Sequence, residues 1–156
     1  VKQESEDEED DEETKGKKFT PVAFHAECIS RIEKHLGVTL VKQSRASFSS
    51  ADKSTKVLCA VSRYHERAKR YWFAFHPHQD AFLTSADRAF VAFGCGDAET
   101  LFLIPFAEFK PWLSHFSKTE KPDRFYWHVK IRGSGKTYWM TTLAGTKDFD
   151  IAKYKI

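Results

Sequence analysis

The sequence predicts an α+β domain, in which helices cover a mainly antiparallel mixed sheet of about six to eight strands. Three observations lead to this class. Short apolar runs separated by turn residues recur along most of the chain, as they do in antiparallel sheets. A longer segment near the start has apolar residues at helical spacing. Aromatic residues make up 15% of the chain, which favours a densely packed, β-rich interior.

The first half is expected to begin with an amphipathic N-terminal helix. Phe24, Cys28 and Ile32 recur at helical spacing after Pro21, and Gly37 supplies the C-terminal stop. Three apolar runs separated by polar turns follow, and their spacing predicts an antiparallel meander. The expected ranges are 22–36 for the helix, 38–42 (with a less regular continuation to 48), 56–61 and 70–75 for the strands, and 79–86 for a short second helix.

The second half is expected to contain two hairpins with a covering helix between them. Pro105 is well placed to begin that helix, and Pro111 is expected to break or kink it. Residues 118–123 have the composition of a polar loop. Gly133-Ser-Gly-Lys136 indicates a hairpin turn, because it lacks the spacing of a phosphate-binding loop. The expected strands are 89–93, 100–104, 125–131 and 136–142, with a last short strand within 149–156.

Charge divides the chain into an acidic tail and a basic body. Residues 1–16 hold nine acidic residues and two lysines, a net charge of −7. We therefore expect 1–18 to be a disordered tail or linker and 19–156 to be the domain. Subtracting residues 1–16 from the chain totals leaves 23 basic and 13 acidic residues in 17–156, a net charge of +10. A basic body is typical of proteins that bind polyanions, although solvated surplus lysines explain the charge equally well.

The cysteines and the ends of the chain set expectations about location. Cys28, Cys59 and Cys95 are odd in number and far apart, so we expect buried free thiols in an intracellular, reducing compartment, the cytoplasm or the nucleus. No apolar run approaches the roughly 20 residues that cross a bilayer, so no membrane partner is expected. Because the chain begins with Val1, we expect a fragment of a larger protein that has upstream domains as partners.

Three Tyr-Trp pairs stand in predicted strands, and basic residues accompany each pair. Successive side chains of a strand point to opposite faces, so each pair sends one aromatic ring inward and one outward. An aromatic surface beside positive charge suits nucleobase stacking or the docking of a partner, whereas rings that simply fill the core and sheet edges are the plain alternative. The pairs are Tyr71-Trp72, Tyr126-Trp127 and Tyr138-Trp139.

The leading hypothesis is a nucleic-acid-binding domain that uses this basic, aromatic sheet face or cleft, with DNA expected rather than RNA. Trp72, Trp127 and Trp139 would stack on bases, with the three tyrosines as opposite-face alternates. If the rings converge, they would form a cage for an unpaired, flipped or modified base. No cofactor is expected for this function. The residues expected to hold phosphates are Arg70, Arg124, Lys130, Arg132 and Lys136.

His76 and His78 follow a predicted strand and precede Asp80. Two histidines at this spacing can hold a metal or donate hydrogen bonds to phosphate. A strand-ending turn with Pro77 as the breaker explains the same residues, so we expect no metal here. We expect both histidines to line the cleft of the nucleic-acid interface.

The segment 22–93 has the order helix, strand, turn, strand, strand, helix and strand, with Glu27 on the helix and Asp52 before the strand 56–61. This order resembles the core of the PD-(D/E)XK nuclease superfamily, which includes restriction endonucleases. The resemblance implies that Asp52 and Glu27 are catalytic carboxylates that hold Mg²⁺, which activates water against a phosphodiester. Val61-Ser62-Arg63 stands where the acid-x-Lys motif would be, so that motif is lost.

Three alternatives to the leading hypothesis therefore stay open. One is a metal-dependent nuclease centred on Asp52 and Glu27, which would need Mg²⁺. Another is a protein-interaction module whose aromatic face meets another domain or subunit. An unrelated α+β domain that shares a common order of elements explains the resemblance without any nuclease ancestry. Whether the protein is an enzyme is left open by the sequence.

Overall fold

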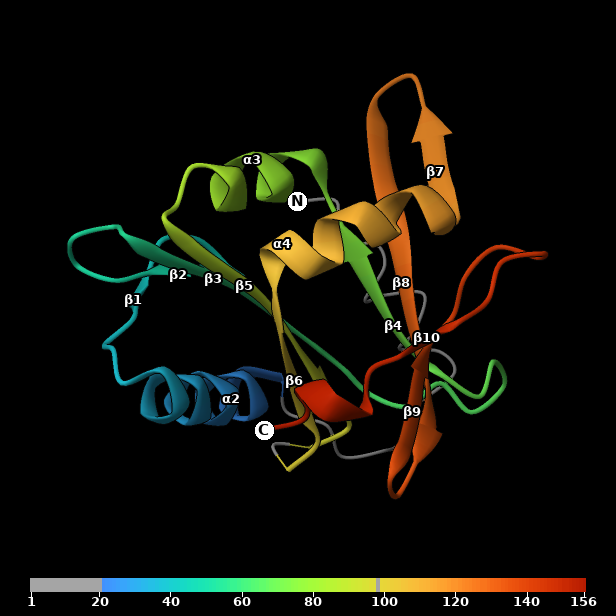
Figure 1. Cartoon of the computed structure of the whole chain (residues 1–156), viewed down its shortest axis with the longest axis horizontal. Coiled ribbons are helices and arrows are strands. Elements are labelled where there is room, and N and C mark those ends of the chain that lie inside the picture. The colour runs from blue at the N-terminus through green and yellow to red at the C-terminus, as the bar shows by residue number, and fades with distance from the viewer. Residues whose placement is uncertain (1–20, 98) are drawn as a thin grey trace.

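The computed structural model describes residues 21–97 and 99–156, so the predicted acidic tail, 1–18, lies outside the described residues. The predicted α+β class is confirmed (Figure 1). Three α-helices and ten strands occur in the described part, which is slightly more strands than expected. The helices are α2 (Pro21–Leu36), α3 (Pro77–Thr84) and α4 (Phe106–Phe109), with 3₁₀ helices η1 (Lys110–His115) and η2 (Ala152–Tyr154).

The strands form two five-stranded sheets rather than one. In the inner sheet the spatial order is β1-β2-β3-β5-β6, and only the β3–β5 pairing is parallel. In the outer sheet the order is β10-β9-β8-β4, β7 pairs with β8, and all pairings are antiparallel. The inner strands are β1 (Val41–Lys42), β2 (Ser47–Ser49), β3 (Thr55–Ser62), β5 (Arg88–Cys95) and β6 (Leu101–Pro105). The outer strands are β4 (Tyr71–Phe75), β7 (Lys118–Lys121), β8 (Arg124–Ser134), β9 (Thr137–Met140) and β10 (Phe149–Asp150).

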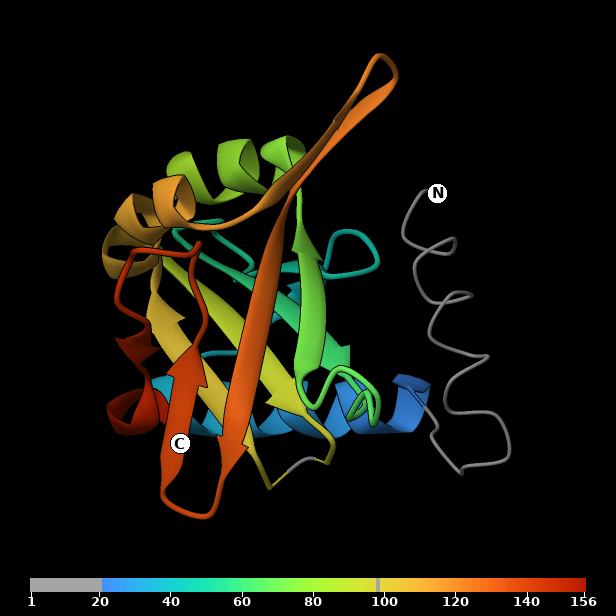
Figure 2. The same cartoon turned by 90° about the vertical axis from the view of Figure 1, so that its right-hand side faces the viewer.

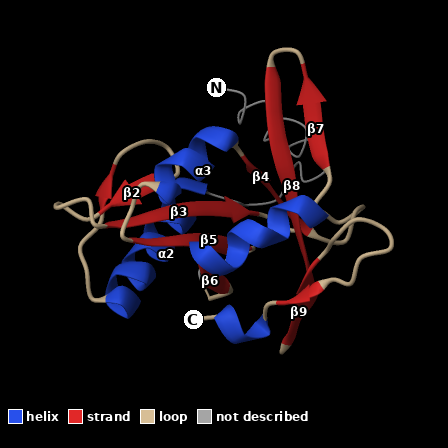
Figure 3. Ribbon diagram, turned by 45° about the horizontal axis from the view of Figure 1, so that its top comes forward, coloured by secondary structure: helices blue, strands red, loops and turns tan. Residues whose placement is uncertain are grey.

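Helix α2 covers one face of the inner sheet, and the outer sheet covers the other (Figures 1 and 3). We call the apolar layer beneath the helix the α2 core. It contains Phe24, Cys28 and Ile32 of α2, spaced by four residues and therefore on one face of the helix. Helix and sheet approach closely at Gly94 of β5. A Cβ atom at this position would lie only 2.9 Å from Sγ of Cys28, so a glycine is needed there.

The second apolar layer, the intersheet core, lies between the two sheets and beneath α3, α4 and η1. Phe73 of β4 meets Phe93 of β5 with ring centroids 4.8 Å apart, and Phe102 of β6 meets Tyr138 of β9 at 5.0 Å. Because the inner sheet is apolar on both faces, β5 is buried from Val91 to Cys95 and β6 from Leu101 to Ile104, as their consecutive apolar residues require. The outer sheet keeps one face toward solvent.

The predicted antiparallel meander over the first strands is wrong in its last step. Strand β4 does not pair with β3; it leaves the inner sheet and pairs with β8, far along the chain. The parallel neighbour of β3 is β5 instead. The sequence of β4 is apolar or aromatic at every position and suits either sheet, so spacing along the chain did not identify its partner. The chain between β3 and β5 thus contains both β4 and α3.

Several boundaries also differ from the prediction. The expected strand 38–42 is reduced to β1, and its continuation to 48 is a turn followed by β2. The expected loop 118–123 contains β7, which pairs with the start of β8. The second helix begins earlier than expected because Pro77 occupies its first turn, where a missing N–H is tolerated. The predicted break near Pro111 is confirmed, since α4 ends at Phe109 and a 3₁₀ helix continues from it.

The structure also bears on the cysteines and on the length and polarity of the helices. Cys28, Cys59 and Cys95 are buried free thiols, as expected. Within the described ranges, every helix is too short or too polar to span a bilayer.

Candidate nucleic-acid interface

The solvent-side face of the outer sheet carries several of the residues that the sequence singled out. Figure 2 looks onto this sheet, with β4, β8, β9 and β10 in front of the inner sheet. Phe73, Val129, Ile131 and Met140 point inward and are almost fully buried. Their neighbours in sequence therefore point outward. The outward residues of the three long strands include Trp72, His128, Lys130, Arg132 and Trp139.

Strand register places the two outward tryptophans on either side of a basic strand. Trp72 of β4 stands opposite Lys130 of β8, and Trp139 of β9 stands opposite Arg132 of β8. Both indoles are half-buried, and the Arg132 guanidinium lies 5.8 Å from the centroid of the Trp139 ring. The face thus presents indole, cations and indole across three adjacent strands, an arrangement that we call the indole–cation face.

In the third pair, Tyr126-Trp127, the tyrosine lies on the solvent-side face and the tryptophan does not. Trp127 lies on the inner face, where its ring is 4.8 Å from Phe125 and 6.0 Å from Phe75. Tyr126 lies on the outer face but is buried, with His76 at 5.4 Å. Tyr71 and Tyr138 point inward, so in those pairs the tryptophan is outward as the alternation requires. Parity along β8 fixes this result, because Val129 and Ile131 must both enter the core.

Trp72 is held in place by a hydrogen-bonded chain. Its Nε1–H donates to Nδ1 of His128 at 2.9 Å. Since Nδ1 accepts, the proton of the neutral ring is on Nε2, which donates to Oγ1 of Thr119 at 2.8 Å. Burial and the nearby Lys130 and Arg70 lower the pKa of His128, which favours this neutral form. The chain fixes the orientation of the Trp72 ring on the outer face.

Two cations meet beside Trp72. Burial and the nearby Arg70 guanidinium lower the pKa of Lys130, so each cation lies within the other's electrostatic field. Nε of Arg70 is buried without a hydrogen-bond partner. The described residues supply neither side chain with a carboxylate partner. A bound anion would relieve both the repulsion and the unsatisfied donor.

Other predicted phosphate ligands lie farther along the sheet. Arg124 stands near the tip of the β7–β8 hairpin, with its guanidinium 5.6 Å from the Tyr126 ring. Lys136 is exposed in the turn between β8 and β9. His76 precedes α3 and stacks on His78, with ring centroids 5.3 Å apart. Burial and the neighbouring His78 lower the pKa of His76 to about 4, and its buried Nε2 has no hydrogen-bond partner.

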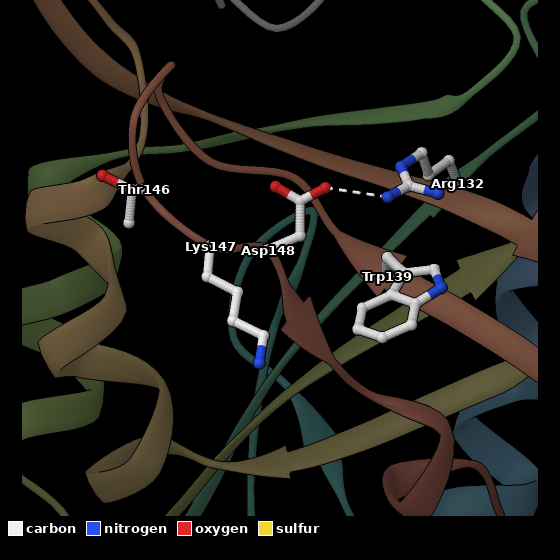
Figure 4. Close-up of a pocket in the computed structure, with 5 residues that line it drawn as sticks. All are labelled: Arg132, Trp139, Thr146, Lys147 and Asp148. Atoms are coloured by element: carbon white, nitrogen blue, oxygen red, sulfur yellow. Dashed lines mark hydrogen bonds and ion pairs between the residues drawn. The ribbon is translucent and has the colours of Figure 1, made fainter.

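An open pocket of about 330 Å³ lies at the other end of the indole–cation face (Figure 4). Besides Arg132 and Trp139 it is lined by Thr146, Lys147 and Asp148 of the loop before β10. Sequence reasoning missed these three loop residues. Nothing in a polar Thr-Lys-Asp run indicates a site; only the antiparallel pairing of β10 with β9 brings the loop beside Trp139.

Asp148 is firmly positioned in this pocket. Its Oδ2 accepts from Nη2 of Arg132 at 2.9 Å, and its Oδ1 accepts from the backbone N of Thr142 at 2.9 Å. The Thr142 Oγ1 lies 3.2 Å from Oδ1, but its one proton is donated to the carbonyl oxygen of Thr146 at 2.7 Å. Partial burial favours the neutral acid, but these hydrogen bonds outweigh it and lower the pKa of Asp148. The carboxylate is therefore ionised at neutral pH and acts only as an acceptor.

The two carboxylates suggested by the nuclease resemblance occupy plain structural positions. Asp52 is exposed in the turn between β2 and β3, where it accepts hydrogen bonds from Oγ of Ser50 at 2.7 Å and from N and Oγ of Ser54 at 3.0 and 2.8 Å. These bonds lower the pKa of Asp52 to about 2. Glu27 is exposed on α2. The side chain of Asp52 thus stabilises its own turn, as aspartates commonly do.

Comparison of the chain with models of known protein families, with curated proteins and with solved structures finds no match in any of the three. The candidate interface is therefore described by its geometry alone. It is the open face of an antiparallel sheet, with two half-buried indoles beside clustered cations.

Proposed function

We propose that this protein binds nucleic acid, in the first place DNA, on the indole–cation face. The observation that carries the proposal is the register of β4, β8 and β9, which sets Trp72 and Trp139 on either side of Lys130 and Arg132. An aromatic ring beside cations matches a strand whose bases stack while its phosphates are neutralised. Stacking on one exposed aromatic side chain is worth about 1–3 kcal/mol.

Arg70, Lys130 and Arg132 are the proposed phosphate ligands. Arg70 lies close enough to lower the pKa of Lys130, and Arg70 has a buried donor with no partner. Phosphate oxygens accept strong charge-assisted hydrogen bonds from such groups. Contacts of this kind position the strand without reading its sequence. Any sequence preference must therefore come from the aromatic rings and the groups beside them.

The test is the salt dependence of binding to a labelled 12-nucleotide DNA strand, measured by fluorescence anisotropy with an RNA of the same sequence for comparison. Three phosphate contacts predict a log–log slope of about −2, because each contact contributes roughly 0.7 on single strands. Lys130→Gln should weaken binding and make the slope shallower by about 0.7.

The matched control is Lys34→Gln, which removes the same charge from the exposed side of α2, on the far side of the inner sheet. It should leave the slope unchanged. Absence of binding at low salt, binding that ignores salt, or equal effects of the two substitutions would each refute the proposal. A protein partner that is captured without any nucleic acid, while DNA fails to bind, would instead favour the interaction-module alternative.

The nuclease alternative has one supporting observation. The chain order α2, β1, β2, β3, β4, α3, β5 follows the order of elements that prompted the resemblance, although β4 pairs with β8 in the outer sheet. The donor set fits Mg²⁺ poorly, because Val61 is apolar, Arg63 is cationic and the Asp52 carboxylate is engaged by its own turn. Digestion of plasmid DNA with Mg²⁺ or Mn²⁺ separates the two functions. Cleavage that Asp52→Ala abolishes would establish the nuclease.

A further inference from the structure

We propose that the pocket beside Trp139 receives one unpaired base that carries an exocyclic amino group, presented by a single strand of nucleic acid. This inference rests on the proposed function and names the class of ligand that the indole–cation face takes. It is carried by the pocket, by the Trp139 indole on its wall and by the engaged Asp148 carboxylate at its edge.

The size of the pocket points to a single base. Its volume of about 330 Å³ lies at the lower end of the range of about 300–1,000 Å³ that is usual for small-molecule sites. Trp139 is half-buried and held by β9, so it supplies a rigid platform for stacking. A paired base is covered by its neighbours on both faces and presents no free edge, so only an unpaired base can stack here.

The hydrogen-bonding groups at the pocket select among bases. A carboxylate has about four acceptor positions, and Asp148 uses one on Oδ1, for the backbone N–H of Thr142, and one on Oδ2, for Arg132. Oδ2 therefore keeps one position for a donor from a ligand. Arg132 supplies donors beside it, and Lys147 lines the same pocket with its side chain directed away from the Asp148 carboxylate (Figure 4). The pocket thus offers one fixed acceptor next to several donors.

This combination favours cytosine over thymine. Cytosine presents an amino donor at N4, next to ring and carbonyl acceptors that Arg132 or Lys147 can meet. The single ring N–H of thymine is flanked on both sides by carbonyl oxygens, which the Asp148 carboxylate repels. Adenine also has an exocyclic amino group and belongs to the accepted class. A hydrogen bond to a charged group accounts for a preference of about tenfold.

The experiment compares dC12 and dT12, two pyrimidine strands of equal charge, by anisotropy at pH 7.5 and one fixed salt concentration. The wild-type protein should bind dC12 about tenfold more tightly than dT12. In Asp148→Asn the ratio should fall to about one, because the neutral amide no longer repels the thymine carbonyls and brings an N–H₂ donor of its own. Asp87→Asn, an exposed charge change beside β5 of the inner sheet, should keep the tenfold ratio.

A second measurement leaves the protein unaltered, in case Asp148→Asn fails to fold. A strand of N4,N4-dimethylcytosine has no amino hydrogens and should bind wild-type protein about as weakly as dT12. Equal affinities of wild-type protein for dC12 and dT12, or a preference that survives dimethylation, would overturn this inference while leaving the proposed function intact. Failure of both unmodified strands to bind at low salt would instead remove the proposed function itself.

Discussion

Histidine 128 shows how a single side chain stabilises the proposed interface. It accepts from Trp72 and donates to Thr119, so it must be neutral to hold both partners. Protonation would place a hydrogen on Nδ1 against the indole N–H. His76 is buried and His25 half-buried, and burial lowers the pKa of both. All three histidines therefore favour the neutral form in the folded protein.

The pH dependence of stability follows from these shifts. The unfolded histidines titrate near about 6.5, whereas His76 titrates at about 4 when folded. Between these values the unfolded state binds more protons, so the free energy of unfolding must fall as pH falls below about 6.5. His76 alone contributes a slope of up to about 1.4 kcal/mol per pH unit. Urea unfolding at pH 7.5, 6.5 and 5.5 measures how the free energy of unfolding changes with pH.

His76→Gln is the informative variant, since it removes the histidine whose pKa is lowered to about 4. It should flatten the decline in stability between pH 6.5 and 5.5. A wild-type free energy of unfolding that is constant over this range would show that the histidines are not protected from protons. Asp52 and Asp148 do not contribute to the change in stability between pH 6.5 and 5.5. The pKa of each carboxyl group is lowered, so both groups titrate below this pH range.

What the sequence could reveal at single positions depends on alternation. Parity along a strand predicts that one member of each Tyr-Trp pair faces outward, but it does not say which one. That choice is made by the flanking residues, such as Val129 and Ile131, whose burial turns Trp127 inward. Asp148 could not be found at all, because its role comes from a loop that folds back onto Trp139 through the pairing of β10 with β9.

Among the elements, the β8–β9 hairpin has the tightest backbone constraint in the described part of the interface. Gly133 has φ +134°, and a Cβ there would lie 2.1 Å from the carbonyl oxygen of Thr137. Gly135 in the same hairpin has φ +64° with open space around the missing Cβ. Only the first glycine is required by close approach of backbone; the second is required by conformation alone.

These two glycines give a matched pair of substitutions. Gly133→Ala should destabilise the protein by at least about 3 kcal/mol, because the clash is with backbone that cannot move without breaking the pairing of β8 with β9. Gly135→Ala should cost only about 1–2 kcal/mol, the usual penalty of a left-handed conformation. Thermal unfolding followed by circular dichroism measures both. Equal effects would mean that the hairpin adjusts easily, contrary to this geometry.

The elements themselves were mostly predictable from periodicity and turn residues, whereas their partners were not. The pattern of α2 predicts its position closely, since four-residue spacing and Gly37 mark its face and its end. Strand β7 escaped prediction because three of its four residues are charged, and only pairing with β8 makes it a strand. The transfer of β4 to the outer sheet depends on contacts with β8, more than 50 residues away in sequence.

For the molecule as a whole, the inner sheet is common to both apolar layers. Ile32 of the α2 core packs on one of its faces, and Phe75 of the intersheet core lies on the other. Neither layer can lose its packing while the inner sheet stays intact. We therefore expect the helix layer and the outer sheet to unfold together.

This expectation can be tested because no tryptophan belongs to the α2 core among the described residues. Tryptophan fluorescence reports on the outer sheet and η1, whereas far-ultraviolet circular dichroism reports on all elements. The two urea transitions should coincide. Ile32→Ala should destabilise both by the same amount, about 2–5 kcal/mol. A fluorescence transition that stays unchanged in Ile32→Ala would reveal two independent units.

The β7–β8 hairpin rises from the body as a slender arm (Figures 1 and 2). Strand β7 pairs with β8 alone among the described strands, so one row of its amides and carbonyls is open. Unpaired backbone groups on an edge strand can form hydrogen bonds with a strand of another copy of the chain, which leads to aggregation. Lys118, Glu120 and Lys121 line the row with charge, and Pro122 at the tip contributes no N–H. These charges and the proline oppose strand pairing between two copies of the arm. The arm can therefore extend from the body without promoting fibril formation.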